Sequence, residues 1–298
     1  MKYNQIGQSG IQVSQIGFGC MSLGNDEDTN KRIIDQALDY GINFFDTADL
    51  YEKGLNEEQV GKILKEKRSD CILATKVGNQ WRADGSGWDW NPRKEYIIKA
   101  VESSLTRLGT DYIDLYQLHG GTLEDPIDEL IEAFSTLVDQ GKIRQYGISS
   151  IRPEVIREYV ERSAIVSVMM QFSLLDRRPE ESIMKLLDEN EISILARGSI
   201  AQGLLVNKPA REYLNYTAKD VEVAAKAVNF VAGTKRSPSQ TALLYVLKKP
   251  PVASAIVGIR TIVQLNDVAK TTSVPDLTAA EYTFLGESIK PNFYEKFR

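Results

Sequence analysis

Four side chains suited to proton transfer follow three predicted strands of this chain. Asp46 ends one short apolar strand, and Tyr51 comes five residues later in the loop. Lys76 ends the next apolar run, and His119, the only histidine of the chain, directly follows a third. Because an unpaired buried charge is costly, Asp46 needs a partner, for which Lys76 is the candidate. If the strands run parallel in a barrel, all four side chains lie at the same end of it.

This set of residue types could supply a proton near neutral pH. A free tyrosine has a pKa of about 10, which makes it a weak acid at neutral pH. A nearby ammonium group favours the tyrosinate form and lowers the pKa of a phenol. Asp46 would keep Lys76 charged and in place, and a neutral His119 could orient a substrate or share the proton. Each residue alone also has a structural explanation, such as an ion pair at a strand end or a histidine in the core.

The strands that carry these residues belong to a regular alternation of predicted strands and helices. Apolar runs predict eight strands, at residues 16–20, 43–46, 71–76, 112–118, 145–149, 167–171, 192–196 and 253–257. Segments with a helical spacing of apolar residues separate them, which argues for a parallel sheet with right-handed crossovers. We expect an α/β protein with a (β/α)8 barrel, the TIM-barrel fold, whose chemistry lies at the carboxyl ends of the strands.

Three further segments depart from this alternation. Residues 3–13 contain turn residues and predict an N-terminal β-hairpin that covers the floor of the barrel. Long loops follow strand three, over Gly78–Pro92, and strand seven, over Gly198–Lys219. Loops of this length in a compact domain are usually functional. The first of them holds all three tryptophans of the chain, Trp81, Trp88 and Trp90. We expect these side chains to form one wall of a substrate pocket.

Length and composition narrow the class of protein. The chain of 298 residues is long enough for one barrel, so we expect a single domain over residues 1–298. Its net charge of −5 and the lack of a Lys/Arg block disfavour nucleic acid as a partner. No leader and no apolar run of about 18 residues is found, which predicts a soluble, cytoplasmic protein that binds no membrane. Cys20 and Cys71 predict buried thiols rather than a disulfide, and no metal site is expected. No apolar stripe exceeds what barrel helices need, which leaves the oligomeric state open, and a monomer or a weak homo-oligomer is expected.

The motif Asp46-Thr-Ala-x-x-Tyr51, the strand-end Lys76 and the pair Leu118-His119 resemble the aldo-keto reductase family. The resemblance covers nearly the whole chain, from Gly17-Phe-Gly-Cys-Met21 to Gly258-Ile-Arg-Thr261. It implies a TIM-barrel enzyme of the bacterial, NADPH-dependent kind. Such an enzyme reduces aldehydes or ketones to alcohols by hydride transfer from NADPH, with Tyr51 as general acid.

The resemblance also implies which residues hold the nicotinamide end of the cofactor. Ser149 matches a family serine after strand five, where Ser150 replaces the usual asparagine. Gln171 lies two places from the family's glutamine on strand six, which keeps it on the same face of the strand. Arg197 stands where the family usually has an aromatic residue, and a guanidinium can also stack on a flat ring. A cation there would oppose formation of the positively charged NADP⁺.

At the phosphate end of the cofactor, the resemblance assigns two segments. The first resembles the family's loop across the pyrophosphate and contains Ser199, Gly203 and Leu205. Glycine in such a loop lets the backbone approach the ligand closely. The second follows strand eight and opens a helix, a place that favours phosphate. Its residues Gly258, Arg260, Thr261 and Gln264 are expected near the phosphates, with Arg260 and Gln264 at the 2′-phosphate.

Two alternatives remain open from the sequence. A nucleotide-bound regulatory module, like the potassium-channel β subunits of the same family, would keep the cofactor site with little turnover. A phosphate-binding barrel enzyme such as an aldolase would use Lys76 for a Schiff base and would need no Tyr51 beside it. Consumption of NADPH with a panel of aldehydes separates the first from a reductase, and borohydride trapping would reveal the second.

Overall fold

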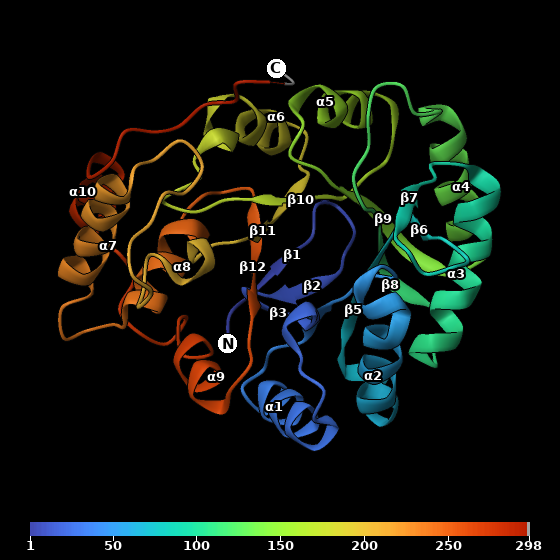
Figure 1. Ribbon diagram of the computed structural model, residues 1–298, viewed down its shortest axis with the longest axis horizontal. Helices are drawn as coiled ribbons and strands as arrows, with labels where there is room; N and C mark the ends of the chain where they lie inside the picture. The colour runs from blue at the N-terminus through green and yellow to red at the C-terminus, as the bar shows by residue number, and fades with distance from the viewer. Residues whose placement is uncertain (297–298) are drawn as a thin grey trace.

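The computed structural model describes residues 1–296 and contains a closed barrel of parallel strands. Around the barrel the order is β10, β11, β12, β3, β4, β5, β8 and β9. These strands are β3 Ile16–Gly19, β4 Phe44–Asp46, β5 Ile72–Val77, β8 Ile113–Leu118, β9 Ile143–Ser149, β10 Ser167–Gln171, β11 Ser193–Arg197 and β12 Val252–Gly258. Helices surround the barrel on the outside (Figure 1). The predicted (β/α)8 TIM-barrel fold is therefore confirmed.

Among the outer helices are some that begin at residues whose side chains cap the helix start, or end at a glycine with a left-handed backbone conformation. The outer helices are α1 Glu27–Asp39, α2 Leu55–Leu64, α3 Lys94–Leu108, α4 Ile127–Asp139, α5 Pro153–Arg162, α6 Ile183–Glu189, α7 Ala218–Ala232, α8 Pro238–Leu247, α9 Ile262–Val268 and α10 Ala279–Glu287. At the start of α7, Thr217 and Asp220 cap each other's backbone amides. At the end of α3, Gly109 has a left-handed φ of 61°, which costs glycine little. Local signals of this kind make helix ends readable from sequence.

An N-terminal hairpin closes the amino-terminal end of the barrel. Its strands, β1 Tyr3–Gln5 and β2 Gln12–Ser14, pair antiparallel. Around them, Ile6, Ile11 and Val13 are buried against inward-facing side chains of the barrel strands. This apolar plug confirms the predicted hairpin and leaves the carboxyl ends of the strands as the end that can receive a ligand.

The segment after β5 differs from the prediction of a loop. Residues 78–92 contain a second antiparallel hairpin, β6 Asn79–Trp81 and β7 Trp88–Trp90. A Cβ added to Gly78, whose φ is 123°, would lie only 2.4 Å from the Trp90 ring. Glycine is therefore needed there both for its conformation and for space. Strands of three residues are too short to show a period-2 pattern, which explains why the sequence did not reveal them.

Further features of the described residues concern the segment after β11, membrane-spanning helices, cysteines and metal sites. The long segment after β11 carries short turns, including the 3₁₀ turn Ala201–Gly203, and an isolated β-bridge between Tyr213 and Tyr216. Within residues 1–296, no helix has the length and apolar character needed to cross a membrane. Cys20 and Cys71 are buried free thiols, as the sequence predicted. The same part of the chain contains no group of His, Cys, Asp and Glu side chains that could hold a metal ion.

Candidate active site

Lys76 forms the centre of a hydrogen-bonded cluster at the carboxyl end of the barrel. It lies near the end of β5, and only 1% of the residue is exposed. Its Nζ donates to Asp46 Oδ1 at 2.6 Å and to the Thr47 carbonyl oxygen at 2.7 Å. A third, longer bond of 3.4 Å reaches the hydroxyl oxygen of Tyr51. Asp46 ends β4 and Tyr51 lies in the loop after it, so two neighbouring strands bring these groups together.

These three bonds stabilise the charged form of Lys76. An ammonium group has three N–H donors, and here each has an oxygen acceptor. Burial opposes the charge, but the carboxylate of Asp46 and the hydroxyl of Tyr51 outweigh it and raise the pKa of Lys76. Because the Tyr51 oxygen accepts from Lys76, the tyrosine's own proton is free to point toward another acceptor. A proton donor and a stabilising cation are thus adjacent.

His119 lies next to Tyr51 in this cluster, and its ring is uncharged. It follows β8, and its ring meets the Tyr51 ring edge-on, with the ring centroids 5.9 Å apart. Burial, together with the charges of Lys76 and Arg197, lowers the pKa of His119 to about 3. The imidazole is therefore neutral near pH 7, with one nitrogen a donor and the other an acceptor. Its Nδ1 is buried and has no hydrogen-bond partner within residues 1–296.

Gln117 is a member of the cluster that the sequence analysis missed. It is fully buried on β8, and its Nε2 donates to Asp46 Oδ2 at 3.2 Å. Asp46 therefore accepts one bond on each carboxylate oxygen, from Lys76 and from Gln117. The signal that could have revealed Gln117 is its position two residues before His119, since alternate residues of a strand share a face.

A second buried network fixes β5 from its outer side. Glu57, on α2, is fully buried and accepts from the Thr75 hydroxyl at 2.6 Å and from Arg107 Nε at 2.7 Å. The pKa of nearby Asp49 is raised well above its usual value, mainly by burial and to a smaller extent by the charge of Glu57. A buried carboxylate is stable only with such partners. The network therefore ties α2 and α3 to the strand residue next to Lys76.

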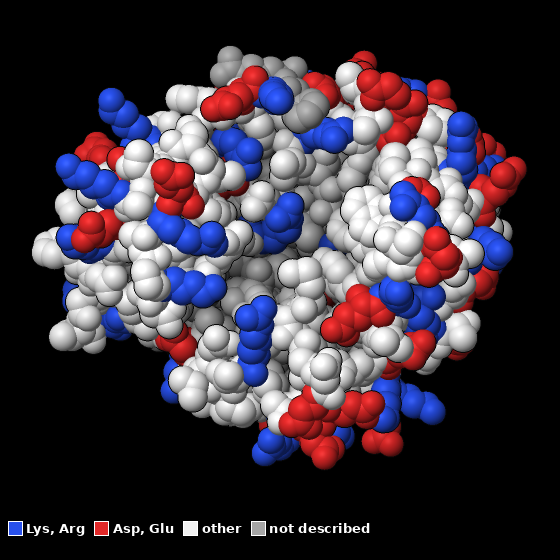
Figure 2. Space-filling model, in the orientation of Figure 1, with Lys and Arg blue, Asp and Glu red and all other residues white. Residues whose placement is uncertain are grey.

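A cavity of about 640 Å³ opens beside the cluster. Tyr51, Lys76 and His119 line it, as do the predicted residues Ser149, Ser150 and Arg197. Its size is in the range that suits a small-molecule site. Figure 2 shows a hollow at the centre of the face seen in Figure 1, with Lys and Arg side chains at its rim. The four side chains singled out from the sequence therefore meet at or next to one cavity.

Two of the three tryptophans expected in a pocket wall have that position. Trp88 and Trp90, both on β7, line the cavity. Trp81 is not among the lining residues: its Nε1 donates to the Leu50 carbonyl oxygen at 3.1 Å, and Lys53 Nζ lies 5.2 Å from its ring centroid. Trp81 thus ties the hairpin to the loop after β4. Of the three tryptophans expected in the wall of a substrate pocket, Trp88 and Trp90 therefore line the cavity and Trp81 does not.

The Aldo/keto reductase family model matches residues 15–289 of this chain. The chain belongs to the aldo/keto reductase family. It is 49% identical over 307 residues to the uncharacterized oxidoreductase YqkF of Bacillus subtilis, with 100% of both chains covered. Aldo-keto reductase YhdN of the same organism is 38% identical over 221 residues, which cover 72% of this chain and 66% of that protein.

Solved structures of this family have the same fold as this chain. The holo form of aldo-keto reductase AKR11C1 from Bacillus halodurans matches with a TM-score of 0.95 at 50% identity, over 100% of this chain and 99% of its own. The apo form of that protein matches with a TM-score of 0.87 at 48% identity, over the same shares of the two chains. Aldo/keto reductases are oxidoreductases that use nicotinamide cofactors and act on small carbonyl compounds, and this chain shares that general activity.

In this aldo/keto reductase, the residues expected at the nicotinamide end follow strands β9 to β11. Ser149 ends β9, and the Oγ of Ser150 accepts from the Arg152 amide at 3.2 Å. Arg197 ends β11 beside Gln171, its register partner at the end of β10. Burial lowers the pKa of Arg197. Gln171 packs near Gly198 and does not line the cavity, whereas Ser149, Ser150 and Arg197 do.

The residues expected at the pyrophosphate lie in the loop after β11. Ser199 is buried, and its Oγ has no hydrogen-bond partner within residues 1–296. Buried polar atoms normally have a partner, so this hydroxyl is suited to a ligand group. Gln202 and Gly203 have φ values of 58° and 91°, and Leu205 is fully buried behind the turn. The unpartnered hydroxyl of Ser199 fits a cofactor that lies along this loop.

The residues expected near the 2′-phosphate lie at the start of α9. Gly258 and Arg260 are exposed, and the Arg260 amide donates to Gln264 Oε1 at 2.8 Å. Thr261 caps α9, because its hydroxyl oxygen accepts from the Gln264 amide at 3.2 Å. An exposed guanidinium beside a capped helix start is chemically suited to an anion such as phosphate.

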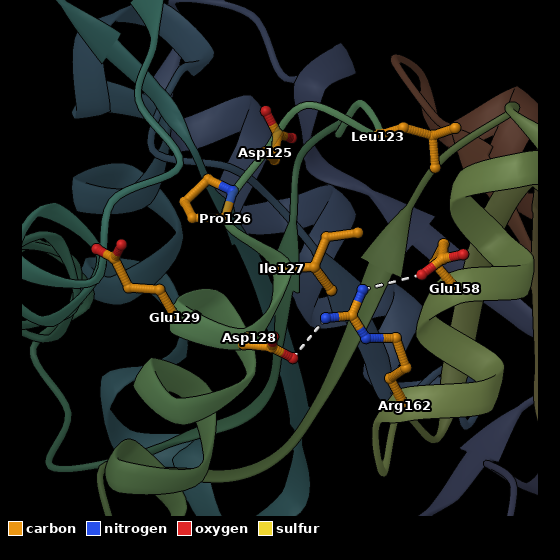
Figure 3. Close-up of a pocket in the computed structure, with 8 residues that line it drawn as sticks. All are labelled: Leu123, Asp125, Pro126, Ile127, Asp128, Glu129, Glu158 and Arg162. Atoms are coloured by element: carbon orange, nitrogen blue, oxygen red, sulfur yellow. Dashed lines mark hydrogen bonds and ion pairs between the residues drawn. The ribbon is translucent and has the colours of Figure 1, made fainter.

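A separate cavity of about 540 Å³ lies between α4 and α5. It is largely acidic, and Arg162 bridges its walls through Asp128 at 2.5 Å and Glu158 at 2.9 Å (Figure 3). Another lining residue, Asp125, accepts from Trp90 Nε1 at 2.8 Å. The acids there have ordinary structural partners, and none of the four candidate catalytic residues lines this cavity. This cavity is therefore separate from the candidate site beside Tyr51.

Proposed function

We propose that this protein is an NADP-dependent aldo-keto reductase that reduces aldehydes or ketones to alcohols, with NADPH as hydride donor and Tyr51 as general acid. One observation carries the proposal: the Tyr51 hydroxyl accepts at 3.4 Å from the buried, charged Lys76 and borders a small-molecule cavity. A fixed ammonium group beside the phenol oxygen can stabilise the negative charge that develops there as the proton leaves. This arrangement supports proton donation to a bound carbonyl oxygen near neutral pH.

Each residue of the cluster has a distinct part in this reaction. When bound, NADPH would supply the hydride that the carbonyl carbon receives. Tyr51 would donate its proton to the carbonyl oxygen, and Lys76 would stabilise the tyrosinate that remains. Asp46 holds Lys76 through the ion pair of 2.6 Å. Neutral His119 would donate a hydrogen bond to the same carbonyl oxygen and so orient it toward Tyr51.

The proposed cofactor site runs from the cavity to the start of α9. We assign the nicotinamide to Ser149, Ser150, Gln171 and Arg197, the pyrophosphate to Ser199, Gly203 and Leu205, and the 2′-phosphate end to Gly258, Arg260, Thr261 and Gln264. The unpartnered Ser199 hydroxyl and the position of Arg197 at the cavity support this path. Because Arg197 is a cation, it would disfavour the positively charged NADP⁺ relative to NADPH.

The variant Tyr51→Phe tests the proposed acid. It keeps the ring and removes the proton donor, so kcat for aldehyde reduction should fall by about 10²- to 10⁴-fold, the usual contribution of an acid–base group. The affinity for NADPH, measured by fluorescence titration, should stay nearly unchanged. Turnover is followed by the absorbance of NADPH. Tyr3→Phe, which changes an exposed tyrosine of the barrel floor, is the matched control.

Two results would contradict the proposal. Near wild-type turnover in Tyr51→Phe would remove Tyr51 from the role of acid. A wild-type protein that binds NADPH tightly but consumes it with no aldehyde or ketone of a broad panel would instead favour a regulatory role for the same fold.

A further inference from the structure

We propose that two copies of this chain associate through an apolar surface on the outside of the barrel, centred on Phe230 and Phe284. This inference goes beyond the proposed function and does not depend on it. Phe230 lies on α7 and Phe284 on α10, two helices that pack side by side (Figure 1). The two ring centroids are 5.5 Å apart, and the exposed fractions are 76% for Phe230 and 45% for Phe284. We call this pair of rings the phenylalanine ridge.

Helix α7 has a second apolar stripe that the barrel does not cover. Its residues Val221, Ala224 and Val228 are buried in the core, whereas Val223 and Phe230 are exposed. Since these two are seven residues apart, they lie on one side of the helix, two turns from each other. The sequence did not set this stripe apart, because buried and exposed apolar residues of α7 are interspersed. Single exposed apolar residues are common, but a contiguous patch of them marks an interaction surface.

The shape of this surface suits a partner with the same surface. One hollow, of about 590 Å³, lies where α7 ends and α10 begins. Another, of about 520 Å³, lies between the middle of α7 and the end of α10. Both rings border both hollows, so the phenylalanine ridge stands between them. In a two-fold dimer one patch serves on both copies, and a ridge with a hollow on each side is suited to such a contact.

The two hollows also carry opposite charges that have no partner. Lys235 lines the first hollow and Glu287 lines the second. Both side chains are exposed, and within residues 1–296 neither charged group has a hydrogen bond or an ion pair. A two-fold axis through the phenylalanine ridge places the first hollow of one copy against the second hollow of the other. Lys235 then faces Glu287 at both ends of the contact, so the charges favour a second copy of this chain as the partner.

The remaining charged groups of the hollows are paired within one copy. Arg236 pairs with Glu281 at 2.5 Å in the first hollow, and Lys226 of the second hollow pairs with Glu222 at 2.7 Å. These ion pairs leave no further charge that opposes association. The surface is also separate from the active site, because its two hollows share no lining residue with the cavity beside Tyr51.

Sedimentation velocity tests the role of the phenylalanine ridge. Between about 1 and 500 μM protein the wild type should pass from monomer to dimer, with a Kd on the order of 10 μM, because small interfaces are weak. Phe230→Asp removes a central ring from each copy and brings two like charges together, so the Kd should rise by about 30-fold or more. The ring is exposed, so the melting temperature should stay near that of the wild type. Val263→Asp changes a side chain of α9 that is 78% exposed and lies outside the surface, and it should keep the wild-type Kd.

Two charge reversals test the orientation of the copies. Lys235→Glu removes the positive partner at both ends of the contact, and Glu287→Lys removes the negative one. Each variant alone should raise the Kd by about fivefold or more, because like charges then face each other twice. An equimolar mixture of the two variants has opposite charges at both ends again and should associate like the wild type. Both variants keep a negative net charge, so a general attraction between them does not explain that result.

The other outcomes count against specific statements. A wild type that stays monomeric over the whole range would overturn the proposal and leave the phenylalanine ridge for a different partner. A dimer that Phe230→Asp does not weaken would place the interface elsewhere on the molecule. If the wild type forms a larger assembly, Phe230→Asp should divide it into smaller units. A mixture of the charge variants that associates no better than each variant alone would overturn the pairing of Lys235 with Glu287.

Discussion

At the scale of single residues, the site depends on a buried ion pair whose charged groups have hydrogen-bond partners at every polar atom. Lys76 and Asp46 are almost fully buried, yet each N–H of Lys76 and each carboxylate oxygen of Asp46 has a partner. Breaking a buried pair from one side leaves an uncompensated charge and typically costs about 3–5 kcal/mol. Substitution of either residue would therefore mix loss of stability with loss of catalysis. Tyr51 lies at the edge of the pair, so a substitution there tests catalysis with less effect on stability.

Arg260 permits a prediction about the choice of cofactor. If its exposed guanidinium binds the 2′-phosphate, Arg260→Ala removes a charge-assisted hydrogen bond of about 1.5–3 kcal/mol. At about 1.4 kcal/mol per factor of ten, the Kd for NADPH should rise by about 10- to 150-fold. NADH lacks the 2′-phosphate, so its Kd should scarcely change. Calorimetric titration of both dinucleotides measures the two constants.

The control for Arg260→Ala is Arg32→Ala, an exposed arginine of α1 that bonds only to Thr29 in the described chain. It removes the same charge from the protein and should leave both affinities as they are. Equal weakening of NADPH and NADH by Arg260→Ala would place Arg260 away from the 2′-phosphate, and the proposed preference for NADPH would lose its structural basis.

At the scale of elements, the β6–β7 hairpin decides the shape of the cavity mouth. It leaves β5 after Val77, the residue that follows Lys76, and returns with Trp88 and Trp90 at the cavity. The Trp90 ring packs against Gly78, and its Nε1 donates a hydrogen bond to Asp125 Oδ1 at 2.8 Å. These two contacts fix the position of Trp90. Trp88 is 48% exposed and has room to be changed without loss of core packing. The two tryptophans therefore differ, one as a support and the other as a contact surface.

Trp88→Ala should change substrate selection more than stability. Loss of roughly 50 Å² of apolar contact costs about 1 kcal/mol, which corresponds to about fivefold in KM for a bulky aldehyde. For a small aldehyde that does not reach the hairpin, KM should stay near the wild-type value. The matched control is Trp81→Phe, on the same hairpin but away from the cavity. A rise in KM that is the same for large and small aldehydes would mean that Trp88 only holds the hairpin.

The elements also show what the sequence can and cannot predict. Strand β10 was predicted with its observed bounds, Ser167–Gln171, and the other barrel strands differ by one or two residues at their ends. Buried parallel strands are continuous apolar runs between capped helices, which leaves little ambiguity. The β6–β7 hairpin was missed because its strands of three residues are too short to show a period-2 pattern.

At the scale of the whole molecule, the barrel explains why some site residues were predictable. Asp46, Lys76 and His119 come at strand ends, and a closed parallel barrel brings all strand ends to one rim. Gln117 and the cavity-lining Arg152 were missed for different reasons. Gln117 lies inside a strand that reads as core, and the place of Arg152 depends on the path of the loops after β8 and β9. Loop conformation of that kind is not encoded in residue spacing.

The single histidine gives the molecule a pH-dependent stability with a definite sign. Burial lowers the pKa of His119 from 6.5 to about 3 in the folded chain. Between these pH values the unfolded chain binds a proton that the folded chain does not. The free energy of unfolding should therefore fall as the pH falls from about 6.5 toward 3, by up to about 1.4 kcal/mol per pH unit from this group.

Replacement of His119 by glutamine isolates this contribution. The chain has no other histidine, and Lys76 and Arg197, whose charges lower the pKa of His119, stay charged between pH 5 and 8. Urea unfolding of the wild type and of His119→Gln at pH 5, 6, 7 and 8 gives the two stability profiles. The carboxylates titrate in both proteins, so only the difference between the profiles reports on His119. That difference should change by about 1.4 kcal/mol per pH unit at the acid end and level off above about pH 7.5. Parallel profiles from pH 5 to 8 would show that the imidazole titrates normally in the folded chain, and the neutral hydrogen-bond donor proposed for the active site would then be wrong.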